Sequence, residues 1–234
     1  MKWFGRYGSG ADSARSRHRD LPVDRVALDD VPTDPAALLA QAAYLQLGLF
    51  SSLSKASSEA PDMDSKGALA SAAGQILTKH RALVSSLERR GVEASRAMQP
   101  FSEQTDEFFR MAEGTNWHEA IAGNYLIGGL LDDFFGRLLA AVEPDGKDLA
   151  QVLRGPRGSD EIVDILSAAT ASDSRLGSKL AVWGRRLVGD TLLIARSALP
   201  ETVRTPDGEA RVEPILTELM AEHTRRMDRL GLTA

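Results

Sequence analysis

The fold is decided by a long apolar stretch in the middle of the chain, NWHEAIAGNYLIGGLLDDFFGRLLAAV, which occupies residues 116–142. Its centre, from Tyr125 to Leu131, is apolar on every side, and that is typical of a helix buried in the middle of a protein. The turn-forming residues Pro144-Asp145-Gly146 mark where this helix stops. We therefore expect a central helix here, with other helices packed around it.

The segments on either side of this stretch carry apolar residues at the three- and four-residue spacing of one helix face. A helix from Pro35 follows the capping residue Asp34, and Gly91 ends the next one. The stripe of that second helix contains Leu69, Ala73, Ile76, His80, Leu83 and Leu87. The expected helices are 35–58, 64–90, 116–142, 175–199 and 213–230, with shorter ones at 105–113, at 147–154 and from residue 159. Long helices joined by short breaks predict an all-α bundle of antiparallel neighbours.

Composition limits the function classes. The 234 residues include 43% hydrophobic residues, enough for one sizeable core, and the net charge of −5 argues against a general nucleic-acid binder. The chain has no cysteine, which excludes disulfides, thiolate metal sites and cysteine nucleophiles. Residues 1–33 are rich in Gly, Ser, Arg and Asp, so we predict a flexible N-terminal extension and one helical domain over 34–234. Without a signal peptide or an unbroken membrane-spanning stretch, the sequence predicts a cytoplasmic protein.

Several short strings resemble a ferritin-like family that is common in actinobacteria. They are Ala43-Tyr44, Gly91-Val92, 98–101, 125–134, 222–227 and 230–232, and the most specific is the run from Arg175-Leu176-Gly177 to Trp183-Gly184-Arg185-Arg186 and on to Gly189. The resemblance covers roughly 34–232. The family is related to the tRNA hydroxylase that acts on a prenylated, methylthiolated adenosine. This resemblance implies a four-helix core with additional C-terminal helices.

The resemblance also implies where a di-iron centre would lie. In that superfamily two helices each contribute a Glu, and two others each contribute a Glu-x-x-His pair whose members share one helix face. The corresponding positions here, by the same resemblance, are Gln46 in the first helix, Gln75 with Thr78 or Leu77 with His80 in the second, Gly128 with Asp133 as nearest acid in the third, and Gly155 with Gly158 in the fourth. Pro156, between the last two, would break a helix.

A check on histidines needs no resemblance. The chain has four, and the residues three positions before His18, His80, His118 and His223 are Arg15, Leu77, Thr115 and Met220. Glu-x-x-His therefore occurs nowhere. We interpret His80 as a hydrogen-bonded core residue beside Gln46 or Gln75, and His223 as structural or exposed. Of Asp132 and Asp133, one is expected to face solvent or an arginine of a neighbouring helix, with Arg137 and Arg185 as candidates.

Three functions remain in view. The first is a non-catalytic interaction or structural module without metal or cofactor, dimeric through its long helices or bound to another protein. The second is an iron oxygenase, di-iron or mono-iron, similar to the tRNA hydroxylase but with an irregular ligand set; nucleic acid would be a partner only by that analogy. The third is a binder of a small molecule or lipid-like ligand in the vacated core. We expect no membrane partner.

Overall fold

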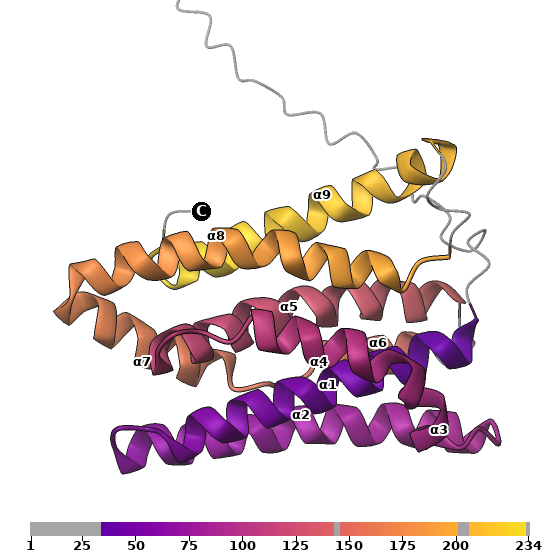
Figure 1. Cartoon of the computed structure of the whole chain (residues 1–234), viewed down its shortest axis with the longest axis horizontal. Helices are drawn as coiled ribbons and strands as arrows, with labels where there is room; N and C mark the ends of the chain where they lie inside the picture. The colour runs from indigo at the N-terminus through magenta and orange to yellow at the C-terminus, as the bar shows by residue number, and fades with distance from the viewer. Residues whose placement is uncertain (1–33, 143–145, 201–205, 233–234) are drawn as a thin grey trace, which may run out of the picture.

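The computed structural model describes residues 34–142, 146–200 and 206–232, and within these ranges every regular element is a helix (Figure 1). The prediction for residues 1–33 falls outside them. The elements are α1 (Pro35–Ser58), α2 (Met63–Arg89), α3 (Ala94–Met98), the 3-10 helix η2 (Gln99–Phe101), α4 (Ser102–Met111), α5 (Trp117–Val142), α6 (Gly146–Arg154), α7 (Ser159–Ser172), α8 (Ser174–Ser197) and α9 (Pro206–Arg229). The predicted all-α class is confirmed.

Side-chain caps explain where several helices start. The Asp34 carboxylate accepts a hydrogen bond from the Ala36 amide at 3.0 Å, and Asp62 accepts one from the Ser65 amide at 2.7 Å. These bonds satisfy amides of the first turn that have no partner within the helix. Gly91 follows α2 with a φ of 73°, the left-handed conformation that a glycine adopts without steric penalty.

Helix α5 lies in the middle of the bundle, with α1 and α2 side by side below it and α8 and α9 above it in the view of Figure 1. It contacts α1, α6, α7, α8 and α9, and residues 121–132 are all buried. The prediction of a helix buried on all sides is therefore confirmed for 125–131. This central position explains why the stretch lacks the polar face of a surface helix.

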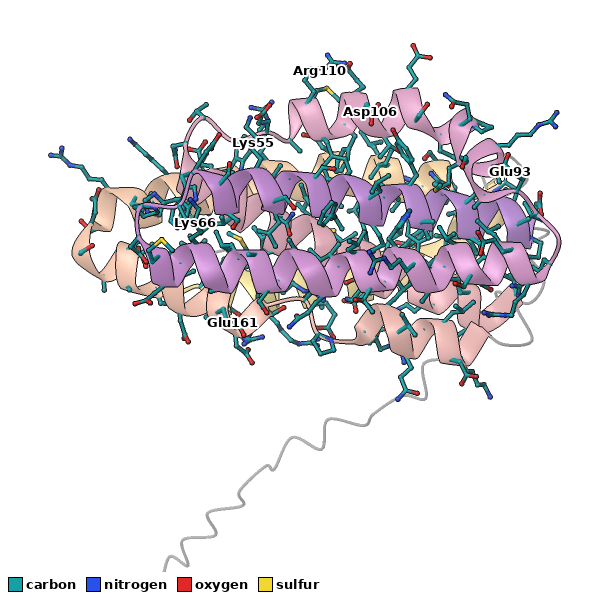
Figure 2. All side chains as sticks on the ribbon, turned by 90° about the horizontal axis from the view of Figure 1, so that it is seen from below. Lys55, Lys66, Glu93, Asp106, Arg110 and Glu161 are labelled. Carbon is teal, nitrogen blue, oxygen red and sulfur yellow. The ribbon has the colours of Figure 1, made fainter. Side chains whose placement is uncertain are left out.

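The fourth position of the core is shared by two short helices. Both α6 and α7 contact α2 and α5, and the chain between them is interrupted at residues 155–158. Together with α1, α2 and α5 they form a four-helix core, to which α8 and α9 are added. Figure 2 views the molecule with α1 and α2 in front and α4 along one edge.

Two details differ from expectation. Helix α9 begins at Pro206 rather than near 213, and Pro214 lies inside it, so that proline is not a start signal here. Helix α1 is long and apolar enough to cross a membrane by length and composition, with a mean hydropathy of 1.3 over 18 residues. In this bundle 56% of that window is buried, a property that core helices of globular proteins share.

Candidate functional site

Among the described residues, one carboxylate, that of Asp132, lies at the centre of the four-helix core. Asp132, on α5, accepts hydrogen bonds from Gln46 Nε2 on α1 at 2.7 Å, Lys79 Nζ on α2 at 2.7 Å and Arg157 Nη1 in the α6–α7 break at 3.0 Å. All four side chains are buried. We call these four residues the central cluster: Gln46, Lys79, Asp132 and Arg157. The cluster connects every helix position of the core.

The two cations of the central cluster have one further acceptor each. Lys79 Nζ also donates to the Leu153 carbonyl at 2.5 Å, and Arg157 Nη2 donates to the Asn124 carbonyl at 2.7 Å. Leu153 lies in the last turn of α6, where carbonyls lose their intrahelical partners. The break after α6 therefore exposes an acceptor to the core, and Lys79 uses it.

The break also determines how Arg157 enters the bundle. Pro156 cannot continue a helix, and Gly158 begins α7 with a φ of 67°. The guanidinium then lies against Gly128 of α5, where an added Cβ would come 1.7 Å from Arg157 Nη2. Arg157 therefore occupies the space that a side chain at position 128 would need. Gly155 and Gly158 both lie in this break, as predicted from the sequence.

The charges of the central cluster are unequal. Asp132 is its only carboxylate, whereas Lys79 and Arg157 are both basic, with residue exposures of 3% and 7%. Burial lowers the pKa of Lys79, the nearby Asp132 opposes that shift, and repulsion from Arg157 adds to it. Burial likewise lowers the pKa of Arg157. With every group ionised, the cluster holds one positive charge in excess.

The central cluster does not match the ligand set of a di-iron centre. Iron of that kind is held by several carboxylates and histidines, whereas this centre holds one carboxylate, one neutral amide and two cations. Both cations contact the same oxygen, Asp132 Oδ2, so a metal ion would have to displace them. Among the described residues, no group of three or more His, Cys, Asp or Glu side chains is placed to hold a metal ion.

The second-helix candidates lie away from the centre. Thr78 is exposed and donates to the Gly74 carbonyl of its own helix at 3.0 Å. His80 is half-buried, and its Nδ1 lies 2.8 Å from the Ala43 carbonyl, so it is hydrogen-bonded as expected, although to backbone rather than to a glutamine. Gln75 is half-buried and lines a neighbouring cleft. Neither of the two residue pairs predicted for α2, Gln75 with Thr78 or Leu77 with His80, contributes a residue to the central cluster.

Asp133 has a different partner from its neighbour Asp132. Asp133 forms a salt bridge with Arg226 of α9. Arg137, one of the two expected partners, pairs instead with Glu218, which also lies on α9. The prediction of an arginine from a neighbouring helix is confirmed for Asp133, although that arginine is Arg226 of α9 rather than Arg137. Asp133 therefore ties an additional helix to the core and lies outside the central cluster.

Lys79 and Arg157 were missed by the sequence reasoning. Lys79 lies three residues after Ile76 and four before Leu83, so it fits the apolar stripe of α2 as well as His80 does. A lysine on such a stripe was the available signal, and the structure buries Lys79 while leaving His80 half-buried. No spacing could have found Arg157, because it lies between two helices.

Two clefts flank the core. One, of about 690 Å³, lies between α5, the α6–α7 break and α9, and Asp132 and Arg157 reach its wall. The other, of about 510 Å³, lies between α1, α4 and α5. Figure 2 shows Lys55, Asp106 and Arg110 of this second cleft along one edge of the bundle and Glu161 of the first along the opposite edge. Lys55 pairs with Glu113, and Asp106 accepts from the Tyr44 hydroxyl at 2.9 Å.

A family model described as the ferritin-like domain of actinomycetes matches residues 33–202. These residues include the four-helix core and α8. No curated protein matches the chain.

Proposed function

The chain belongs to the ferritin-like family of actinomycetes, and from that premise we propose that it is a member without a di-iron centre, which acts as a structural or interaction module. The observation that carries this proposal is the bonding of Lys79 and Arg157 to Asp132 at the middle of the core. The two cations neutralise the carboxylate of the central cluster and repel a further cation. The arrangement favours helix cross-linking over metal binding.

Several features support a structural role for the central cluster. Its hydrogen bonds join α1, α2, α5 and the α6–α7 break through buried atoms. Removing the Asp132 carboxylate would leave two buried cations without a counter-charge, and breaking a buried ion pair in this way typically costs about 3–5 kcal/mol. Because the cluster reaches every helix of the core, it holds the broken fourth helix in register with the other three.

The alternative, an iron oxygenase similar to the tRNA hydroxylase with an irregular ligand set, has less support. It would need Gln46, His80 and Asp133 to converge, but they contact Asp132, the Ala43 carbonyl and Arg226 respectively. A binder that uses a vacated core has little support too, because the cluster fills that space. For the module we propose a second copy of the chain or another protein as partner, in the cytoplasm.

Metal analysis tests the proposal. The full chain would be expressed in iron-supplemented medium beside a genuine di-iron protein of the superfamily, and the iron in each purified protein would be measured. We expect far less than one iron per chain here, with stoichiometric iron in the comparison protein. One or two irons per chain that disappear in the Asp132→Asn variant would overturn the proposal. Iron that persists in that variant would lie elsewhere and leave the proposal for the central cluster intact.

A further inference from the structure

Residues that line the cleft between α5, the α6–α7 break and α9, here called the α9 cleft, carry buried hydrogen-bond donors that have no acceptor among the described residues. Arg157 uses Nη1 for Asp132 and Nη2 for the Asn124 carbonyl, but its Nε has no acceptor among the described residues. Arg226 uses Nη2 for Asp133 and leaves Nη1 without an acceptor in the same part of the chain. A buried donor without a partner is destabilising, so native proteins seldom leave one unsatisfied.

A third donor lies at the same cleft. The Tyr125 hydroxyl is buried, in a residue only 2% exposed. The Arg229 guanidinium lies within reach to donate a hydrogen bond to its oxygen, but no described residue accepts its proton. Burial raises the pKa of Tyr125, while the positive charges of Arg229, Arg226 and Arg157 oppose that rise. The hydroxyl therefore stays protonated near neutral pH and is available as a donor close to three arginines.

The charge of the central cluster favours a negatively charged ligand. Asp132 is the single carboxylate that faces both Lys79 and Arg157, so with both cations ionised one buried positive charge has no counter-charge in the cluster. Five arginines and five carboxylates line the α9 cleft, so its walls do not supply the missing negative charge. An uncompensated buried charge costs several kcal/mol, and a bound anion beside Arg157 would remove that cost.

Local geometry at the start of α7 also suits an anion. Gly158 caps this 14-residue helix without a side-chain hydrogen bond, and residues 158–161 line the α9 cleft. The helix dipole and the first-turn amides favour negative charge at that end, part of which the first-turn carboxylates Asp160 and Glu161 already supply. The volume of about 690 Å³ lies in the range of small-molecule sites.

We propose that the α9 cleft binds a small metabolite through an oxyanion group, either a phosphoryl group or a carboxylate, held by Arg157 Nε, Arg226 Nη1 and the Tyr125 hydroxyl. Salt bridges to Asp132 and Asp133 fix the two guanidinium groups before the ligand arrives, which lowers the entropic cost of binding. Both arginines present donors in the planar geometry that carboxylates and phosphates prefer. The site goes beyond the proposed structural role, and its test involves no iron, so the two proposals fail independently.

Titration calorimetry with two probes tests the site. Inorganic phosphate and succinate would each be titrated into the full chain in a buffer without other oxyanions. We expect saturable binding of at least one probe with one site per chain, and the probe that binds more tightly identifies a phosphoryl or a carboxylate source. Absence of saturable binding of both probes up to about 10 mM, a Kd that already corresponds to very weak affinity, would overturn the proposal.

Variants locate the binding. Tyr125→Phe removes only the hydroxyl, and Arg226→Gln removes the guanidinium while keeping a polar side chain. Each should weaken binding about tenfold or more, because each removes a hydrogen bond to a charged group. The control Arg110→Gln changes an exposed arginine that pairs with Glu107 at the other cleft. Unchanged affinity in a folded Tyr125→Phe variant, or an equal loss in Arg110→Gln, would contradict the proposed site. Tyr125→Phe keeps the test valid if Arg226→Gln does not fold.

Discussion

Replacing Asp132 with Asn should destabilise the protein far more than replacing Lys79 with Met. Asp132 carries the only negative charge of the central cluster, with Lys79 and Arg157 2.7 and 3.0 Å from one of its oxygens. Asn has the same shape, and Gln46 Oε1 has no hydrogen-bond partner among the described residues, so a flipped Gln46 amide could accept from the new side-chain NH2. The hydrogen bonds are then retained, and the variant loses only charge.

The magnitude follows from that loss. With Asn at position 132, two buried cations would face each other without a counter-charge, and breaking a buried ion pair from one side costs about 3–5 kcal/mol. Such a loss is a large share of the roughly 5–15 kcal/mol by which domains are usually stable. In Lys79→Met, by contrast, Asp132 still pairs with Arg157. The loss of two hydrogen bonds is then offset by removal of the excess charge and of a buried ammonium, so we expect a change within about 1 kcal/mol.

Urea unfolding followed by circular dichroism at pH 7 measures both changes. Asp228→Asn, at an exposed position on α9, serves as the control and should change the unfolding free energy by less than about 0.5 kcal/mol. A loss below about 1 kcal/mol in Asp132→Asn, or a larger loss in Lys79→Met than in Asp132→Asn, would refute the reasoning about excess charge.

Two further predictions concern packing and pH. Gly128→Ala should cost about 1–3 kcal/mol, because its Cβ would overlap Arg157 Nη2 and displace a guanidinium held by Asp132 and the Asn124 carbonyl. Gly74→Ala, with nothing within 4 Å, should gain about 0.5–1 kcal/mol in the same urea assay. Equal effects of the two changes would contradict the close approach of Arg157 to Gly128. Burial, with repulsion from Arg226, lowers the pKa of His223 below its ordinary value of 6.5, so protonation favours the unfolded chain. The stability that the neutral His223 contributes should be fully present above pH 6.5 and be lost as the pH falls from there toward the folded-state pKa. His223→Leu should therefore make the fall of the unfolding free energy between about pH 7.5 and 5 shallower. An unchanged slope would contradict this reasoning.

Most of the fold could be predicted because helix signals are local. Capping by Asp34, the left-handed Gly91 and the stripe of α2 depend on residues within a few positions of one another. Those signals placed α1, α2 and α5 within one or two residues of their observed bounds. The start of α9 was misplaced because Pro214 is typical of a first helical turn, yet the helix continues through it.

The site was less predictable, since its members come from segments far apart in the chain. The sequence shows that Glu-x-x-His occurs nowhere and that Pro156 interrupts the fourth helix position. By the resemblance alone, Gln46 stands at a position where an acid is expected. These are matters of residue identity and local backbone chemistry.

Which side chains occupy the centre follows from how the helices pack. Periodicity admitted either Lys79 or His80 on the inner face of α2, and the packing of α2 against α1 and α6 turned the lysine inward. Arg157 enters because the break between α6 and α7 lies opposite Gly128, a juxtaposition of residues 29 positions apart that no local pattern encodes. A buried charge is stable only beside its counter-charge, and which charges meet is determined by how the helices pack.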